Sequence, residues 1–135
     1  MISERSKTVL VTGATGYIAS WIVKFLLEKG HTVHAAVRNK EDKDKTKHLD
    51  EIASKSKGEL KYFESDLLID GSYTKAMKDC EIVFHTASPF IMDSKNPQTE
   101  VIDPAVKGTK NVLSSVNETE TVKKVILTSS VAAIY

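Results

Sequence analysis

The sequence has almost no cysteine, no excess of charge of either sign and no long hydrophobic run. Cys80 is the only cysteine among 135 residues, which rules out an internal disulfide and a cysteine-rich metal site. The sequence has 19 Lys and Arg residues and 18 Asp and Glu residues, so no general excess of positive charge indicates nucleic acid or an anionic membrane as the main partner. The apolar runs are far shorter than the roughly 18 residues that span a bilayer.

The polar N-terminal residues also lack the apolar core of a secretory signal. The composition that remains is that of an ordinary globular chain, with 41% hydrophobic and 27% charged residues. The length is typical of about one domain. We therefore expect a protein of a reducing, cytoplasmic setting that binds neither membrane nor nucleic acid.

Segments typical of strands alternate with segments typical of helices. Strands are expected at Thr8–Thr12, Thr32–Val37, Leu60–Glu64, Glu81–His85 and Val122–Ser129. Helices are expected at Tyr17–Lys29, Asn39–Lys57, Gly71–Lys78 and from Asn96-Pro97 to about Val116. This alternation predicts an α/β fold: a doubly wound (Rossmann) parallel sheet of order 3-2-1-4-5 with helices on both faces.

Single residues give further local expectations. Pro104 lies inside the last predicted helix and predicts a kink or a broken first turn there. The first helix is apolar on a wide face, so Trp21 is expected in the core. Cys80 is expected to be a small buried side chain, and His85 a satisfied polar residue at a strand end.

A glycine-containing turn joins the first predicted strand to the first helix. Its sequence, from Thr12 to Ala19, is T-G-A-T-G-Y-I-A. Gly13 can adopt the tight turn, Gly16 lets the backbone approach a pyrophosphate, and the small Ala19 lets helix and strand lie close. Free N–H groups and the helix dipole would then face an anion. The pattern predicts a dinucleotide-binding loop, with an ordinary tight turn as the alternative.

The end of the second predicted strand indicates which dinucleotide binds. NAD sites usually place a carboxylate there for the ribose hydroxyls. This chain has Arg38, and no carboxylate occurs between Lys29 and Glu41. Because an arginine can pair with a 2′-phosphate and stack on adenine, NADP is favoured over NAD. The alternative is that Arg38 is only a solvated residue at a strand end.

Five segments, in the right order, resemble the extended short-chain dehydrogenases/reductases of the NAD-dependent epimerase/dehydratase type. The glycine turn resembles their T-G-x-x-G-x-x-G/A fingerprint, and Ser65-Asp66-Leu67 resembles their D-L element. Val83–Pro89 (V-F-H-T-A-S-P) is similar to one branch, the dihydroflavonol, cinnamoyl-CoA and related microbial carbonyl reductases. Val106–Leu113 resembles the G-T-x-N-V-L helix of that branch, and Leu127–Ser130 its T-S-S.

The resemblance implies a role for residues that follow the predicted strands, where open α/β sheets bind ligands. It places Gly13 and the amides of Thr15, Gly16, Tyr17 and Ile18 at the pyrophosphate, Arg38 at the 2′-phosphate, Asp66 and Leu67 at the adenine, and Thr86, Ala87 and Ser88 at the nicotinamide ribose. Ser130 would be the catalytic serine that hydrogen-bonds the substrate carbonyl, with Ser129 as the alternative. No metal ligand is implied.

Two features depart from the family pattern. Many extended members have an asparagine where this chain has Val101–Pro104, and the proline, common in the reductase branch, disfavours an epimerase. The family's general acid, in a Tyr-x-x-x-Lys unit, is not found, since Tyr135 lies too near Ser130 to be that tyrosine. Residues 1–135 therefore resemble the NAD(P)-binding part of a reductase without its C-terminal catalytic and substrate region.

We thus expect the nucleotide-binding portion of an NADPH-dependent reductase of small-molecule aldehydes or ketones. A sugar-nucleotide epimerase or dehydratase is the neighbouring alternative, because the same loop serves both. A non-catalytic dinucleotide-sensing domain is the alternative from another class, because the tyrosine and lysine are missing. The outer edge of the fifth strand, at Val125–Thr128, would be bare, which predicts self-association there.

Overall fold

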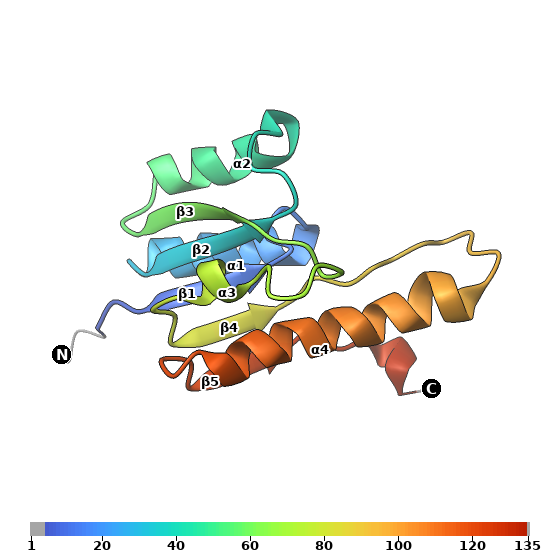
Figure 1. The fold of residues 1–135 in the computed structure, drawn as a ribbon. Helices are drawn as coiled ribbons and strands as arrows, with labels where there is room; N and C mark the ends of the chain where they lie inside the picture. Colours follow the sequence, from blue (N-terminus) through green and yellow to red (C-terminus); the bar gives the residue numbers. More distant parts are fainter. Residues whose placement is uncertain (1–4, 135) are drawn as a thin grey trace.

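A computed structural model describes residues 5–134, which form one parallel sheet with helices on both faces (Figure 1). The strands are β1 (Thr8–Thr12), β2 (Thr32–Val37), β3 (Glu59–Glu64), β4 (Ile82–His85) and β5 (Lys124–Leu127). Their order is β3-β2-β1-β4-β5, and every neighbouring pair is parallel. The predicted order is confirmed. Tyr135 lies outside the described residues.

Helices cover the two faces of the sheet in pairs. They are α1 (Tyr17–Glu28), α2 (Lys43–Ser54), α3 (Thr74–Met77) and α4 (Asp103–Glu118). Side chains alternate along β1, so Val11 joins a core with α1 and α2, whereas Leu10 joins a second core with α3 and α4. Both residues are fully buried. The central strand is apolar throughout because it lies between two helical layers.

The prediction that Trp21 belongs to the core is wrong. Trp21 is 47% exposed, and its ring lies tilted against that of Phe25 at a centroid distance of 5.8 Å, with the ammonium of Lys24 over the indole. The core positions of α1 are Ala19, Val23 and Leu27, spaced four residues apart. Because α1 is apolar on most of its circumference, hydrophobicity alone does not determine which side faces the sheet.

The chain before α4 forms a single π-helical turn, Gln98–Ile102, and the α-helix proper begins at Asp103. Pro104 occupies the first turn of α4, where its missing N–H leaves no helical hydrogen bond unmade. The broken first turn predicted at Pro104 is confirmed. β5 is shorter than the predicted Val122–Ser129, because its neighbour β4 ends at His85, whose carbonyl accepts the last cross-strand bond, from Thr128 N–H.

Candidate functional site

The predicted site residues follow the carboxyl ends of the five parallel strands, and so lie along one edge of the sheet. The chain first builds outward from β1 through β2 to β3, and then crosses to β4 and β5 on the other side of β1. The loops after β1 and β4 therefore diverge at the centre of this edge (Figure 1). Open α/β sheets bind ligands at such a switch point.

The glycine turn after β1 has no room for a side chain at its first glycine. Gly13 has φ +61°, and a Cβ there would lie 3.1 Å from both Cα and Cβ of Ala87. Gly13 O accepts a hydrogen bond from Gly16 N at 3.0 Å, which closes the turn. Gly16 is then the N-cap residue of α1 and offers no capping side chain. The turn thus delivers an uncapped helix N-terminus to the switch point.

Free amides gather at the N-terminus of α1. Within residues 5–134, the N–H groups of Thr15, Tyr17 and Ile18 donate to no protein acceptor. Such groups, together with the helix dipole, form an anion-binding site. One predicted amide needs a correction: Gly16 N–H is engaged with Gly13 O, because that bond makes the turn. Gly16 can still allow close approach of a ligand, but not as a free donor.

A buried polar network, which the sequence did not indicate, joins β1 to β4 below the turn. Thr12 is fully buried, and its Oγ1 accepts hydrogen bonds from Thr86 N at 3.1 Å and Ala87 N at 3.0 Å. Its third partner is His85 Nδ1 at 2.8 Å. Since both amides donate, the hydroxyl hydrogen goes to His85 Nδ1, and the imidazole carries its own proton on Nε2. Thr12 and His85 are partners in the β1–β4 register, a pairing that the sequence alone does not show.

This network restricts what the loop after β4 can offer a ligand. The backbone N–H groups of Thr86 and Ala87 are occupied, and Thr86 Oγ1 donates to Thr12 O. Burial lowers the pKa of His85 below its ordinary value, which is consistent with a neutral ring. His85 is thus a satisfied polar residue, as predicted. Ser88 lies next along the same loop.

Arg38 follows β2 at the same edge, is exposed, and forms no ion pair or hydrogen bond with the rest of residues 5–134. A carboxylate from the neighbouring strand, which the sequence of β2 could not show, follows at this edge. Glu64, in register with Val37, accepts a hydrogen bond from Lys40 N at 3.4 Å. An arginine without a protein partner remains available to an anion.

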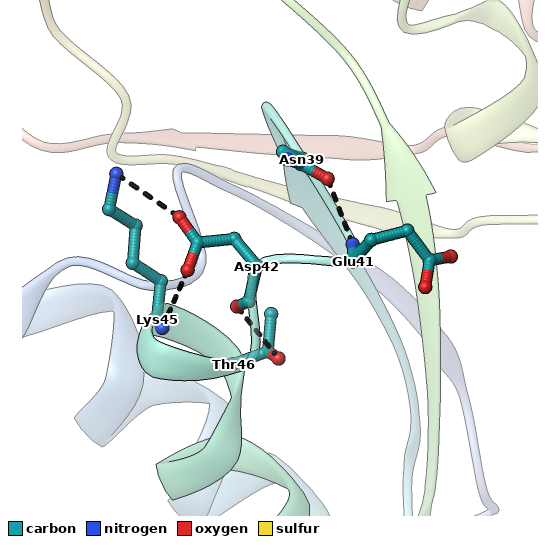
Figure 2. Close-up of polar contacts among 5 residues, drawn as sticks. All are labelled: Asn39, Glu41, Asp42, Lys45 and Thr46. Carbon is teal, nitrogen blue, oxygen red and sulfur yellow. Dashed lines mark hydrogen bonds and ion pairs between the residues drawn. The ribbon is translucent and has the colours of Figure 1, made fainter.

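Figure 2 shows the turn that follows Arg38 and begins α2. Asn39 Oδ1 accepts from Glu41 N at 2.9 Å, and Asp42 Oδ1 accepts from Lys45 N at 3.3 Å as the N-cap of the helix. Lys45 Nζ also lies 3.5 Å from Asp42 Oδ2. Thr46 Oγ1 donates to Asp42 O at 3.1 Å. The lysine charge is thus partly balanced within the turn, whereas that of Arg38 is not.

The loop after β3 carries Asp66 and Leu67, and Asn111 of α4 holds it. Asn111 Nδ2 donates to the carbonyls of Leu67 at 3.1 Å and Ile69 at 2.8 Å, with Asp66 O at 3.4 Å, and its Oδ1 accepts from Gly71 N at 3.0 Å. The motif G-T-x-N signalled this asparagine but not its role. A side chain of α4 therefore holds the loop that would contact adenine.

Ser130 and Ser129 follow β5 and are exposed. Ser130 Oγ accepts from Ala132 N at 3.2 Å and caps the short 3₁₀ turn Val131–Ala133. Within residues 5–134 its O–H donates to no protein acceptor. In the described part of the chain, no three His, Cys, Asp or Glu side chains come together as a metal site, and no helix is long and apolar enough to cross a bilayer.

The fold and this edge define a dinucleotide-binding protein of the Rossmann class. The chain belongs to the NAD dependent epimerase/dehydratase family, whose sequence profile matches residues 9–135. The resemblance inferred from the five segments is thereby confirmed.

Its relatives are reductases. It is 48% identical over 132 residues to cinnamoyl-CoA reductase CAD2 of Medicago truncatula, a match that spans 98% of this chain and 40% of that protein. It is 42% identical to dihydroflavonol 4-reductase of Gerbera hybrida, over 99% of this chain and 36% of the relative. The Gre2–NADPH complex of Candida albicans aligns at a TM-score of 0.79 with 35% identity, covering 94% and 38% of the two chains. The chain thus spans about two fifths of its relatives' length.

Proposed function

We propose that residues 1–135 are the NAD(P)-binding Rossmann domain of an NADPH-dependent carbonyl reductase similar to the dihydroflavonol reductases. The observation that carries the proposal is the group of unpaired amides at the N-terminus of α1, presented at the switch point of the sheet. The relatives at 48% and 42% identity bear reductase names, and the related Gre2 structure is a complex with NADPH.

The residues present fit such a cofactor. At the N-terminus of α1, the N–H groups of Thr15, Tyr17 and Ile18 have no acceptor within residues 5–134, which suits a diphosphate. Arg38 would pair with the 2′-phosphate, Asp66 and Leu67 would contact adenine, and the loop from Thr86 to Ser88 would border the nicotinamide ribose. NADPH, when bound, supplies a hydride to the carbonyl carbon of the substrate.

Ser130 would hold the carbonyl oxygen of a small aldehyde or ketone. Because its Oγ accepts from Ala132 N, its hydroxyl hydrogen is free to donate to that oxygen. A Tyr-x-x-x-Lys unit does not occur among the 135 residues. We therefore propose that this chain alone binds the dinucleotide without reducing a carbonyl, which is also what a dinucleotide-sensing domain would do.

The experiment that tests the proposal is titration with NADPH and NADH by calorimetry, together with Arg38→Gln. We expect NADPH to bind more tightly, by about tenfold or more, because a charge-assisted bond to the 2′-phosphate contributes roughly 1.5–3 kcal/mol. Arg38→Gln should remove most of the difference and leave NADH unchanged. Equal or tighter binding of NADH to the wild-type protein would remove the role assigned to Arg38.

Two finer expectations accompany this proposal. A cytoplasmic location is supported by the cysteine content, a single thiol at Cys80, since proteins of oxidising compartments more often carry paired cysteines. Self-association through β5 is supported by exposed Ile126 and Leu127 on a strand that has only β4 as a neighbour within the described residues.

A further inference from the structure

The hydroxyl of Ser20, in the first turns of α1, has three close partners. Ser20 Oγ lies 2.6 Å from Gly16 O, 3.4 Å from Ala14 O and 2.8 Å from His48 Nε2 of α2. A carbonyl can only accept, so the single hydroxyl hydrogen is directed to Gly16 O. The imidazole must then donate, which assigns a proton to His48 Nε2. A serine bonded to the carbonyl four residues earlier is common in helices, whereas a second partner from another helix is not required by helix geometry.

Both carbonyls that Ser20 approaches belong to peptide groups of the glycine turn. The peptide bond is planar, so the direction of each C=O fixes the direction of the N–H that follows it. Gly16 O shares its peptide plane with Tyr17 N–H, and Ala14 O shares its plane with Thr15 N–H. Both belong to the group of amides at the N-terminus of α1 that donate to no protein acceptor within residues 5–134. Because the hydroxyl hydrogen goes to Gly16 O, the contact bears on the direction of Tyr17 N–H, whereas Ala14 O, at 3.4 Å, receives no hydrogen from Ser20.

We propose that His48 is a positioning residue for the diphosphate of the dinucleotide: through Ser20 Oγ it fixes the peptide group that presents Tyr17 N–H. In this role His48 acts through Ser20 and not by contact with the ligand. Gly16 has no side chain that could cap α1, and its carbonyl accepts both Ser20 N–H, at 2.8 Å, and the Ser20 hydroxyl, so the hydroxyl adds a second bond to the carbonyl that precedes Tyr17 N–H. The inference rests on the proposed function, since it concerns the diphosphate of that cofactor.

A simple packing contact between α1 and α2 is the competing explanation. The two helices also meet through the buried apolar side chains of Val23, Leu27 and Leu49, which belong to one core. That contact does not depend on His48, which is only half-buried. Removing the imidazole should thus leave the fold intact, so an effect on ligand binding can be separated from an effect on stability.

Two substitutions at position 48 form a matched pair. Glutamine places an amide N–H at about the reach of the imidazole Nε2, whereas asparagine is one methylene shorter. We expect His48→Asn to weaken NADPH binding about three- to tenfold, the range of one net hydrogen bond, and His48→Gln to stay within about twofold of the wild type. Both variants should unfold near the wild-type temperature. Binding is measured by calorimetry and folding by circular dichroism.

The choice of ligand gives a second comparison. ADP-ribose carries the diphosphate, and 2′-AMP carries only the 2′-phosphate. The loss in His48→Asn should appear with ADP-ribose and be absent with 2′-AMP, because the positioned amide of Tyr17 would face the diphosphate alone. Equal loss with both ligands, or loss of thermal stability with unchanged binding, would make His48 a packing residue and overturn the proposal.

Ser20→Ala tests whether His48 acts through the hydroxyl of Ser20. Ser20→Ala should weaken NADPH binding as much as His48→Asn does, and the double variant should show no additional loss, because one chain of contacts is broken in each case. Fully additive losses, or unchanged binding in Ser20→Ala, would overturn the inference while leaving the proposed function standing. A wild-type protein that binds neither NADPH nor ADP-ribose would instead contradict the proposed function.

Discussion

The hydroxyl of Thr12 satisfies three groups where the ends of β1 and β4 meet. A valine would fill nearly the same volume but would leave the amides of Thr86 and Ala87 and the Nδ1 of His85 without a partner. We expect Thr12→Val to lower the free energy of unfolding by about 1–3 kcal/mol, measured by urea denaturation. Thr8→Val, at the start of the same strand, is the control and should be nearly neutral. Equal effects of the two substitutions would contradict this role.

The neutral state of His85 makes the stability of the fold dependent on pH. Burial lowers its pKa from the ordinary 6.5. Above that value the ring is neutral in the folded and in the unfolded chain. As the pH falls below 6.5, the unfolded chain takes up the proton first, so the free energy of unfolding decreases. His85→Asn keeps an acceptor for Thr12 and cannot titrate, so we expect a flatter profile as the pH falls below about 6.5. Parallel wild-type and variant profiles would be the opposite result.

Gly13 combines a left-handed backbone with a close neighbour. In Gly13→Ala the alanine would have to adopt φ +61°, which is strained for a residue with a side chain. Its Cβ would also lie only 3.1 Å from Ala87. We expect a loss of about 1–3 kcal/mol in the free energy of unfolding and much weaker NADPH binding. Gly30→Ala shares the positive φ, +85°, but has only Lys57 Cβ nearby, at 4.0 Å. It should cost less stability and leave binding unchanged.

At the scale of elements, local sequence determined some boundaries and distant contacts determined others. β1 and β2 match the predicted Thr8–Thr12 and Thr32–Val37, because glycine or charged residues bound short β-branched runs that are buried on both faces. β5 is shorter than predicted because β4 ends first, a limit that its own sequence does not contain. The orientation of Trp21 likewise depends on which side of α1 packs against the sheet.

In the candidate site, too, local sequence determines some features and distant contacts determine others. The turn from Gly13 to Ala19 could be predicted because glycine spacing expresses backbone geometry directly. The bonds of Asn111 to the loop that carries Asp66 cross about 40 residues of sequence, and no local pattern indicates them. The engagement of the Gly16 amide was also missed, since the sequence does not tell which N–H closes the turn.

Asn111 joins two elements, α4 and the loop after β3. In Asn111→Asp the shape is kept, but a carboxylate oxygen replaces the donor that faces the carbonyls of Leu67 and Ile69. Asn111 is only 6% exposed, so water cannot substitute for the lost bonds. We expect the free energy of unfolding to fall by at least about 2 kcal/mol, measured in urea. Lys107→Gln, on the exposed side of the same helix, is the control; a similar loss there would contradict the assignment.

At the scale of the whole molecule, the strand order decides both where the site lies and which edges are open. The order β3-β2-β1-β4-β5 puts the glycine turn at the centre of one end of the sheet and leaves β3 and β5 at its sides. The two sides differ in chemistry. β3 presents exposed Glu59 and Lys61, whereas β5 exposes Ile126 and Leu127. Charges protect an edge strand from pairing with another chain, and apolar residues do not.

This contrast predicts that self-association depends on β5 and not on β3. Ile126 is 39% and Leu127 59% exposed, on a strand whose far side has no neighbour within residues 5–134. Ile126→Lys should shift the protein toward monomer in sedimentation velocity, because a buried ammonium at a strand–strand interface is costly. Lys61→Gln, which removes a charge from β3, is the matched control and should leave the distribution unchanged. A wild-type protein that stays monomeric at high concentration, or equal sedimentation of all three forms, would show that the β5 edge does not pair.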